Sequence, residues 1–245
     1  MNFIVVIPAR YSSKRFPGKP LADISGIPMV IRTYLQCIKA VSPDLVYVAT
    51  DDDRIKNICD QWDIKVIITS KDCLTGTDRI AEVSTIISTD FYINIQGDEP
   101  IFNPDDISLI IKAAHQFPGA VINGYSEIIN EADYFNYSIP KVVFDEDCNL
   151  LYMSRAPIPA NKDSKFFRSW RQICAYSYPK QALKLFNEVK QKKPLELMED
   201  IEMLRFLELG VNIKMVKMSN QSISVDKPAD IQSVESIIQN FKELK

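Results

Sequence analysis

Short apolar runs that alternate with amphipathic helical patterns are the feature that most constrains how this chain folds. In the first half the apolar runs are FIVVIPA (3–9), LVYVAT (45–50), KVIIT (65–69), YINIQ (92–96) and AVING (120–124). The helical patterns between them cover residues 28–41, 52–62, 77–88 and 104–117. Continuous apolar strands separated by helices are typical of a mostly parallel sheet with helices on both faces. The first half therefore predicts a Rossmann-like α/β fold, in which ligands bind beyond the carboxyl ends of the strands.

The second half of the chain breaks this alternation. The segments PKVVFDED and NLLYMSR (140–155) predict a β-hairpin whose turn runs from Asp145 to Cys148. Further strands are expected at 171–179 and 213–218, and helices at 180–190, 195–209 and 228–244. The segment 157–170 is loop-like and is expected to project as an arm. We therefore predict one domain over residues 1–245 with an excursion at about 140–178.

Composition excludes several classes of function. The 245 residues carry a net charge of −3, whereas a nucleic-acid-binding surface would normally make the chain basic. No apolar run approaches the roughly 20 residues that span a bilayer, and the apolar start lacks the charged region of a signal peptide. The five scattered cysteines form no CxxC pair, as is usual for reduced thiols. We expect a cytoplasmic protein without nucleic-acid or membrane partners.

A basic loop, PARYSSKRFPGKPL (8–21), follows the first predicted strand and is the strongest local signal. Its four cations are Arg10, Lys14, Arg15 and Lys19. A loop at a strand end, stiffened by proline and opened by glycine, can wrap a triphosphate with backbone N–H groups and fixed cations. It is neither a Walker loop nor a GxGxxG turn, and the missing glycine-rich turn disfavours a dinucleotide-dependent oxidoreductase. The alternative is an ordinary solvated basic loop.

Carboxylates at two other predicted strand ends could bind a metal ion. Asp98 and Glu99 in NIQGDEP follow a buried strand, and Mg²⁺ prefers such hard oxygen ligands. The simpler alternative is that Asp98 caps the next turn. Asp226 in SVDKP follows a short strand-like run, and taken alone it is best explained as the N-cap of the helix near Pro228. In TGTDR (75–79) a threonine is expected to cap a helix.

Seven segments in the same order make the chain recognisable. They are PARYSSKRFPGKPL, ATDDDRI (49–55), TGTDRIAE (75–82), NIQGDEP (94–100), SRAPIP (154–159), PLELMEDIEMLR (194–205) and SVDKPADI (224–231). Together they resemble the CMP-Kdo synthetase (3-deoxy-manno-octulosonate cytidylyltransferase) family over nearly the whole length. The resemblance implies a nucleotide-diphospho-sugar transferase type of fold, a homodimer and Mg²⁺ as cofactor. It also implies transfer of CMP from CTP to the anomeric hydroxyl of a 2-keto-3-deoxy sugar acid, Kdo first of all, with release of pyrophosphate, for lipopolysaccharide or surface polysaccharide synthesis.

The same resemblance implies roles for individual residues. It makes Asp98 and Asp226 the ligands of Mg²⁺. The residues implied in catalysis are Arg10, Arg15, Lys19 and Asp98. The residues implied in nucleotide binding are Ala9, Arg10, Lys19, Thr75, Gly76, Thr77, Arg79, Gln96 and Asp98. The residues implied in sugar binding are Arg155, Gln172, Tyr176, Glu202 and Met203. Arg155 and Arg171 are candidates for the substrate carboxylate, because a guanidinium group matches a carboxylate with two parallel hydrogen bonds.

The sugar side departs from the family's pattern. The family usually has Lys-His or Arg-His followed by Leu/Ile-Gly, where this chain has Gln172 in place of histidine and Cys174 in place of glycine. The family's Glu-Gln-Leu-Arg has Met203 in place of glutamine, and Ser138 replaces a frequent asparagine. These changes leave open that the acceptor is an amino-substituted octulosonate or a nonulosonate. They equally leave open that Met203 faces the core and that Gln172 simply substitutes for histidine.

A nucleotide-binding regulator without turnover is a second alternative, of another class. The retained carboxylates Asp98 and Asp226 disfavour it, because a protein that only binds nucleotide could lose them. Pyrophosphate release from CTP that depends on an added sugar acid distinguishes these alternatives.

Overall fold

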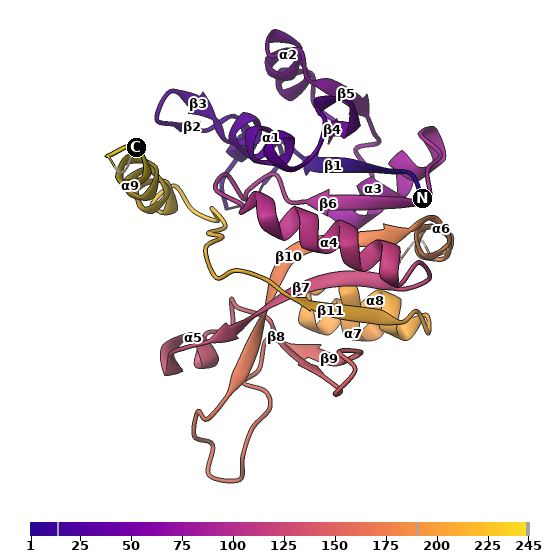
Figure 1. Ribbon diagram of the computed structural model, residues 1–245, viewed down its shortest axis with the longest axis vertical. Helices are drawn as coiled ribbons and strands as arrows, with labels where there is room; N and C mark the ends of the chain where they lie inside the picture. Colours follow the sequence, from indigo (N-terminus) through magenta and orange to yellow (C-terminus); the bar gives the residue numbers. More distant parts are fainter. Residues whose placement is uncertain (14, 190, 244–245) are drawn as a thin grey trace.

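A mixed β-sheet with helices on both faces organises the molecule (Figure 1). The computed structural model describes residues 1–13, 15–189 and 191–243, so Lys14 of the basic loop lies outside it. Over the described residues the main path of the sheet runs β11–β7–β10–β6–β1–β4–β5. These strands are β1 (Phe3–Ala9), β4 (Val46–Thr50), β5 (Lys65–Ile68), β6 (Phe91–Ile95), β7 (Val121–Ile128), β10 (Ser169–Pro179) and β11 (Ile213–Lys217). Every pairing on this path is parallel except those of β10, which confirms the predicted Rossmann-like, mostly parallel α/β fold.

Strand β1 is buried on both faces because its alternate side chains enter two different cores. Val5 and Ile7 pack in the first core, and Ile4 and Val6 pack in the second. The first core is covered by α1 (Met29–Ala40), α2 (Asp53–Gln61) and α4 (Pro104–Gln116). The second is covered by α3 (Gly76–Ile86), α6 (Lys180–Glu188) and α8 (Met203–Glu208). Each fully buried aliphatic side chain contributes about 1.5–3 kcal/mol to this packing.

The carboxyl ends of β1 and β6 approach each other closely. A Cβ atom on Gly97 would lie 2.8 Å from the carbonyl oxygen of Pro8, so only glycine fits at this position. The contact sets Asp98 beside the basic loop that follows β1. The close approach therefore positions the site described below.

The predicted hairpin is present as β8 (Lys141–Phe144) and β9 (Leu150–Ser154), with its turn at residues 145–148. In Figure 1 the loop between β9 and β10 projects from the lower end of the molecule as the expected arm. Phe167 on this arm is 90% exposed. Strand β10 then returns to the main sheet between β6 and β7, so the sheet includes the last part of the expected excursion. The division of the chain into one domain stays a prediction.

The helix expected over 195–209 is instead two helices, α7 (Pro194–Glu199) and α8. Asp200 between them has a left-handed backbone with φ 52°. The guanidinium group of Arg155 donates to the carbonyl oxygens of Glu199 at 2.5 Å and Asp200 at 3.0 Å. These bonds compete with continued helix formation, and the break follows from tertiary contacts that helical periodicity does not report.

The C-terminal segment crosses back over the molecule (Figure 1). From β11 it passes the end of β6, where the Val225 N–H donates to the Asp98 carbonyl oxygen at 2.9 Å. It ends in α9 (Asp230–Glu243), where Val234 packs with Ile24 of the small hairpin β2–β3. The remaining elements are β2 (Asp23–Ile24), β3 (Ile27–Pro28), α5 (Glu131–Phe135), and the 3-10 turns η1 (Lys19–Leu21) and η2 (Pro43–Leu45). Within the described ranges, no helix is both long and apolar enough to cross a membrane.

Candidate active site

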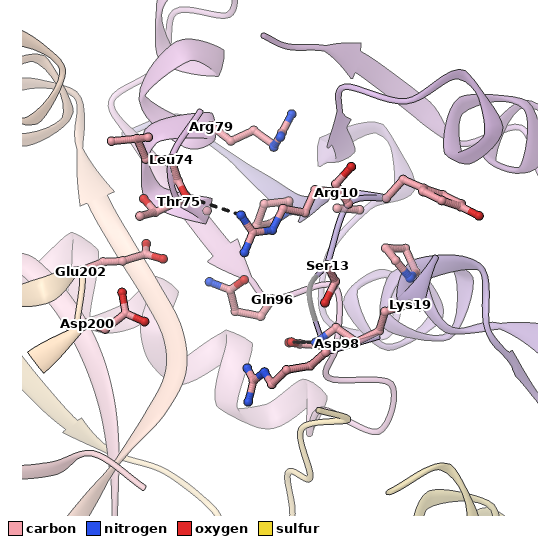
Figure 2. A pocket seen from close by; sticks show the side chains of 18 of the residues that line it. Arg10, Ser13, Lys19, Leu74, Thr75, Arg79, Gln96, Asp98, Asp200 and Glu202 are labelled. Atoms are coloured by element: carbon pink, nitrogen blue, oxygen red, sulfur yellow. Dashed lines mark hydrogen bonds and ion pairs between the residues drawn. The ribbon is translucent and has the colours of Figure 1, made fainter. Parts of the chain in front are cut away.

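A cleft of about 1080 Å³ opens beyond the carboxyl ends of β1 and β6. The basic loop forms one wall, and the start of α3 and the α7–α8 junction form the other (Figure 2). The predicted residues that line it are Ala9, Arg10, Arg15, Lys19, Thr75, Gly76, Arg79, Gln96, Asp98, Arg155 and Glu202. The cleft therefore unites segments that are separated by most of the chain.

Lys19 stands between the two carboxylates that sequence reasoning paired. Its ammonium nitrogen lies 2.6 Å from an oxygen of Asp98 and 3.8 Å from an oxygen of Asp226. It also donates to the Val225 carbonyl oxygen at 3.0 Å. Arg15 meets Asp226 with two N–H groups, at 3.0 and 3.1 Å. Asp98 and Asp226 thus converge on one cation although they are distant in sequence.

This pair of carboxylates fits a magnesium ion better than it fits a metal held by protein alone. In the part of the chain that is described, no group of three or more His, Cys, Asp and Glu side chains could hold a metal ion. Mg²⁺ is commonly bound by one or two carboxylates, with water and substrate phosphates as its other ligands. Asp98 and Asp226 already face a cationic group, the Lys19 ammonium, so their arrangement suits a cation.

Glu99, next to Asp98, is buried and serves the fold rather than the cleft. Its side chain is 4% exposed and accepts a hydrogen bond from the Ser222 hydroxyl. Burial, and secondarily the charge of Asp98, raises the pKa of Glu99 to about 8. Glu99 is therefore mostly protonated at neutral pH, and it ties the C-terminal segment to the end of β6.

The start of α3 brings Thr75 and Gly76 to the cleft. Thr75 caps the helix by accepting from the Asp78 N–H at 3.2 Å. A Cβ atom on Gly76 would lie 3.2 Å from the Gln96 side-chain nitrogen, so this glycine keeps room beside the Gln96 amide. Arg10 reaches toward the same region, with a guanidinium nitrogen 3.5 Å from the Leu74 carbonyl oxygen. These groups offer donors and acceptors to a base or a phosphate.

Two residues predicted to bind nucleotide direct their polar groups elsewhere. Arg79 is 3% exposed, and its guanidinium group pairs with Asp51 at 3.2 Å and donates to Thr69. Thr77 does not line the cleft; its N–H donates to Glu202 at 2.9 Å and its hydroxyl lies 3.0 Å from the Tyr178 hydroxyl. We infer that both residues stiffen the α3 end of the site.

Arg155 lines the cleft, but backbone carbonyl groups already occupy its guanidinium group. Besides the bonds to residues 199 and 200, it donates to the carbonyl oxygens of Tyr137 at 3.2 Å and Ser138 at 3.4 Å. The buried Lys141 ammonium donates to the Arg155 carbonyl oxygen at 2.9 Å. Arg155 therefore holds the segment at residues 137–138 against the segment at residues 199–200. This differs from the predicted role, in which its guanidinium group binds the carboxylate of the substrate.

Three other residues predicted for the sugar, Gln172, Tyr176 and Met203, do not line the cleft, whereas Glu202 does. Gln172 is 9% exposed and donates to the side chains of Asn123 at 3.1 Å and Tyr176 at 3.3 Å. Tyr176 stacks on Tyr178 with ring centroids 5.7 Å apart. Met203 is fully buried in the core covered by α3, α6 and α8, because it lies on the inner face of α8. Met203 thus lies in the core rather than in the cleft, and its predicted contact with the sugar stays a prediction.

Arg171 likewise has other partners. Its guanidinium group donates to the Ser126 hydroxyl at 3.0 Å and to the Asn220 side chain at 2.7 Å. The single histidine, His115, packs edge-on against Phe91 with centroids 5.1 Å apart. Neither residue is among those that line the cleft.

Two charged residues of the cleft were not predicted from the sequence. Lys192 and Asp200 both line the cleft and form an ion pair with each other. Lys192 lies in the run QKKP, which looks like an ordinary solvated charge cluster, and Asp200 lies within an apparently continuous helix. Neither carries a local signal, because the break after α7 is what brings Asp200 to the cleft.

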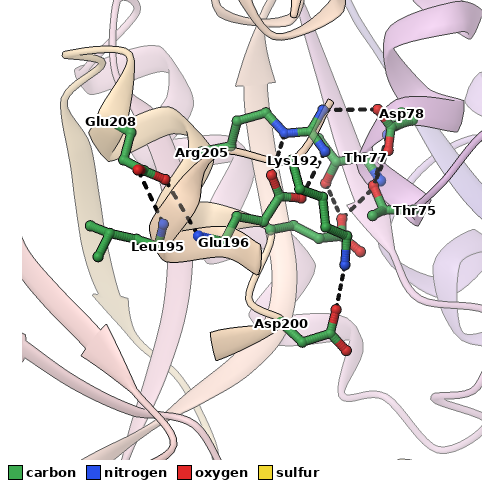
Figure 3. A network of polar contacts seen from close by, with 10 residues as sticks. Thr75, Thr77, Asp78, Lys192, Leu195, Glu196, Asp200, Arg205 and Glu208 are labelled. Atoms are coloured by element: carbon green, nitrogen blue, oxygen red, sulfur yellow. Dashed lines mark hydrogen bonds and ion pairs between the residues drawn. The ribbon is translucent and has the colours of Figure 1, made fainter. Parts of the chain in front are cut away.

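Behind the cleft, a buried ion-pair network joins α3 to α7 and α8 (Figure 3). Arg205 is fully buried and donates twice to Glu196, at 2.5 and 2.7 Å. It also pairs with Asp78 at 3.0 Å and lies over the Phe186 ring at 3.8 Å. Asp78 accepts from the Thr75 hydroxyl at 2.6 Å, so the network reaches the cap of α3.

Comparison with known proteins gives consistent similarities. The family model described as "Cytidylyltransferase" matches residues 4–214. Proteins named 8-amino-3,8-dideoxy-manno-octulosonate cytidylyltransferase, from Shewanella sp. (strain ANA-3) and Shewanella frigidimarina, are each 39% identical over 244 residues. Both matches cover 96% of this chain and 98% of the relative.

Solved structures resemble the whole chain. The structure of CMP:2-keto-3-deoxy-manno-octonic acid synthetase complexed with CTP has a TM-score of 0.92 at 33% identity. That match covers 98% of this chain and 99% of the other. A cytidylyltransferase from Leptospira borgpetersenii has a TM-score of 0.65 at 14% identity over 98% of this chain and 87% of its own, and it supports the fold alone.

Proposed function

The chain belongs to the cytidylyltransferase family, as a nucleotidyltransferase of the CMP-Kdo synthetase type, and we propose that it transfers CMP from CTP to 8-amino-3,8-dideoxy-manno-octulosonate. The observation that carries the catalytic proposal is that Arg15, Lys19 and Asp98 line a large cleft and that Arg15 and Lys19 also pair with Asp226. Cations beside paired carboxylates suit transfer of a phosphoryl-type group, which needs positioning and charge stabilisation more than covalent chemistry.

In the proposed reaction the anomeric hydroxyl of the sugar attacks the α-phosphorus of CTP. A new P–O bond forms to the sugar, the bond to the β-phosphate breaks, and pyrophosphate leaves. Arg10, Arg15 and Lys19 neutralise the negative charge that builds on the leaving group. Thr75, Gly76 and Gln96 position the nucleotide at the start of α3.

Asp98 and Asp226 would hold Mg²⁺ in this reaction. When bound, the ion would neutralise phosphate charge and lower the pKa of the attacking hydroxyl. Because Lys19 and Arg15 now pair with the same carboxylates, we expect both cations to move to the phosphates when CTP binds.

The choice of acceptor follows the relatives rather than the first expectation from sequence, which was Kdo. The curated relatives at 39% identity carry the name of the 8-amino enzyme. Kdo is the second candidate, because the similar solved structure at 33% identity is a synthetase named for that acid. The homodimer, the cytoplasmic location and the role in surface polysaccharide synthesis stay predictions.

The test is release of pyrophosphate from CTP and Mg²⁺ in the presence of each acid. We expect pyrophosphate release to depend on the added sugar acid, and 8-amino-3,8-dideoxy-manno-octulosonate to be a better acceptor than Kdo. Asp98→Asn is expected to reduce turnover at least about a hundredfold, the scale of a lost electrostatic group. The matched control is Asp105→Asn, which changes an exposed carboxylate at the start of α4 and is expected to keep full turnover. Failure of the wild-type protein to use either acid would contradict the proposal.

A further inference from the structure

We propose that Asp200 determines acceptor specificity: its carboxylate receives the ammonium group of the amino sugar, at the position that the Lys192 ammonium holds in the free protein. The inference rests on the proposed function and deepens it, since it concerns which octulosonate the same cleft prefers.

The backbone of Asp200 is fixed while its side chain is open to the cleft. Its N–H donates to the Glu196 carbonyl oxygen at 2.8 Å, and its own carbonyl oxygen accepts from Arg155 at 3.0 Å. The side chain is 73% exposed. Figure 2 shows it beside Glu202, on the wall that faces Arg10 and Lys19. A fixed backbone with an accessible carboxylate is what recognition of a substrate group requires.

A carboxylate as exposed as that of Asp200 is unexpected on this wall, because the proposed substrates of the cleft are both acidic. A triphosphate and a sugar acid both carry negative charge, so this carboxylate would repel each of them. The hydrogen bond from Lys192 lowers the pKa of Asp200, and the charges of Lys192, Arg155 and Arg10 act in the same direction. Asp200 is therefore ionised at neutral pH. An acceptor that carries its own ammonium group removes the repulsion.

The neighbouring carboxylate, Glu202, is less suited to bind the ammonium group of the sugar. Glu202 accepts from the Thr77 N–H at 2.9 Å and from the Thr77 hydroxyl, so its oxygen is already occupied. Burial raises the pKa of Glu202, which reduces its negative charge. Of the two carboxylates, Asp200 is therefore the one that can bind the ammonium group of a ligand.

The present partner of Asp200 is replaceable. Its ion pair with Lys192 joins a side chain that is 24% exposed to one that is 73% exposed. Such a pair is weak because water still reaches both partners. An ammonium group on the bound sugar can therefore displace Lys192. The Lys192 ammonium already lies against the Asp200 carboxylate, so there is room for an ammonium group at this position.

The experiment compares kcat/KM for 8-amino-3,8-dideoxy-manno-octulosonate and for Kdo in three variants. In Asp200→Asn the ratio of the two values should fall about tenfold, the effect of losing about 1.4 kcal/mol of charge pairing. Asparagine tolerates the left-handed backbone, so this variant should fold, which a melting curve checks. In Lys192→Met the ratio should rise, because the internal competitor is gone. The control, Asp163→Asn on the exposed arm, should leave the ratio unchanged.

An equal loss with both acids in Asp200→Asn, or an unchanged ratio, would overturn the role of Asp200 alone. Absence of turnover with either acid in the wild-type protein would overturn the proposed function, and this inference with it.

Discussion

Two clusters in this molecule place basic side chains between carboxylates, and they differ in burial. The buried network is Arg205 with Glu196 and Asp78; the first two side chains are 0% exposed. The exposed cluster is Arg15 and Lys19 with Asp98 and Asp226, whose side chains are 16–65% exposed. Both contain short ion pairs, yet only the exposed cluster has members that line the cleft, namely Arg15, Lys19 and Asp98.

The difference in burial explains why the same chemical groups have a structural role in one cluster and a functional role in the other. Charges removed from water must be fully paired, and breaking such a pair is costly because the remaining charge stays buried. Charges that water still reaches pair weakly and exchange partners easily. The buried network therefore holds α3 against α7 and α8, whereas the exposed cluster can release its carboxylates and cations to substrates.

The largest expected effect comes from breaking the buried network. Arg205→Met removes the partner of the buried Glu196 carboxyl, and should lower the free energy of unfolding by about 3–5 kcal/mol. Urea denaturation followed by circular dichroism measures this change. Adding Glu196→Met should restore most of the loss, because well-packed apolar residues can replace a buried pair. A double variant as unstable as Arg205→Met would contradict the account of this network.

The next effect is on catalysis rather than stability. Lys19→Met removes the cation between Asp98 and Asp226, and turnover of CTP should fall by about 10²–10³-fold. Its free energy of unfolding should fall by clearly less than that of Arg205→Met, since water still reaches Lys19 and Asp98, which are 16% and 23% exposed. The matched control is Lys39→Met, at an exposed position of α1. A stability loss as large as that of Arg205→Met would remove the distinction between the two clusters.

The smallest expected effect concerns the most exposed pair. Arg15 is 65% exposed and Asp226 is 39% exposed, so Arg15→Met should lower the free energy of unfolding by at most about 1 kcal/mol. Salt at about 1 M shortens the Debye length to about 3 Å and should lessen even this difference. Thermal melting at low and high salt checks both statements. A loss that salt does not change would mean that this pair is structural.

Residues of the cleft could be predicted from the sequence where their signal is local. The basic loop after β1 and the NIQGDEP turn after β6 each carry their signal within a few residues, and a parallel sheet brings their strand ends to one edge. Asp226 is harder, because the long crossing from β11 determines where it lies. Only the resemblance to a family, and no local pattern, paired Asp226 with Asp98.

The wall formed by the α7–α8 junction could not be predicted in the same way. The segment LELMEDIEMLR has the periodicity of a continuous helix, and on such a helix Met203 could equally face the cleft or the core. The hydrogen bonding by Arg155 breaks the helix at Asp200, turns Asp200 toward the cleft and leaves Met203 in the core. Contacts between distant segments decide these positions, so local propensity does not contain them.

In the proposed reaction the exposed cluster binds the pyrophosphate that leaves. Titration calorimetry of Mg²⁺ with pyrophosphate, and separately of CMP, into the wild-type protein and Lys19→Met tests it most directly. The account predicts that Lys19→Met weakens pyrophosphate binding at least about tenfold, or about 1.4 kcal/mol, and changes CMP binding much less, since CMP lacks the β- and γ-phosphates. Equal weakening of both ligands, or unchanged pyrophosphate binding, would contradict it.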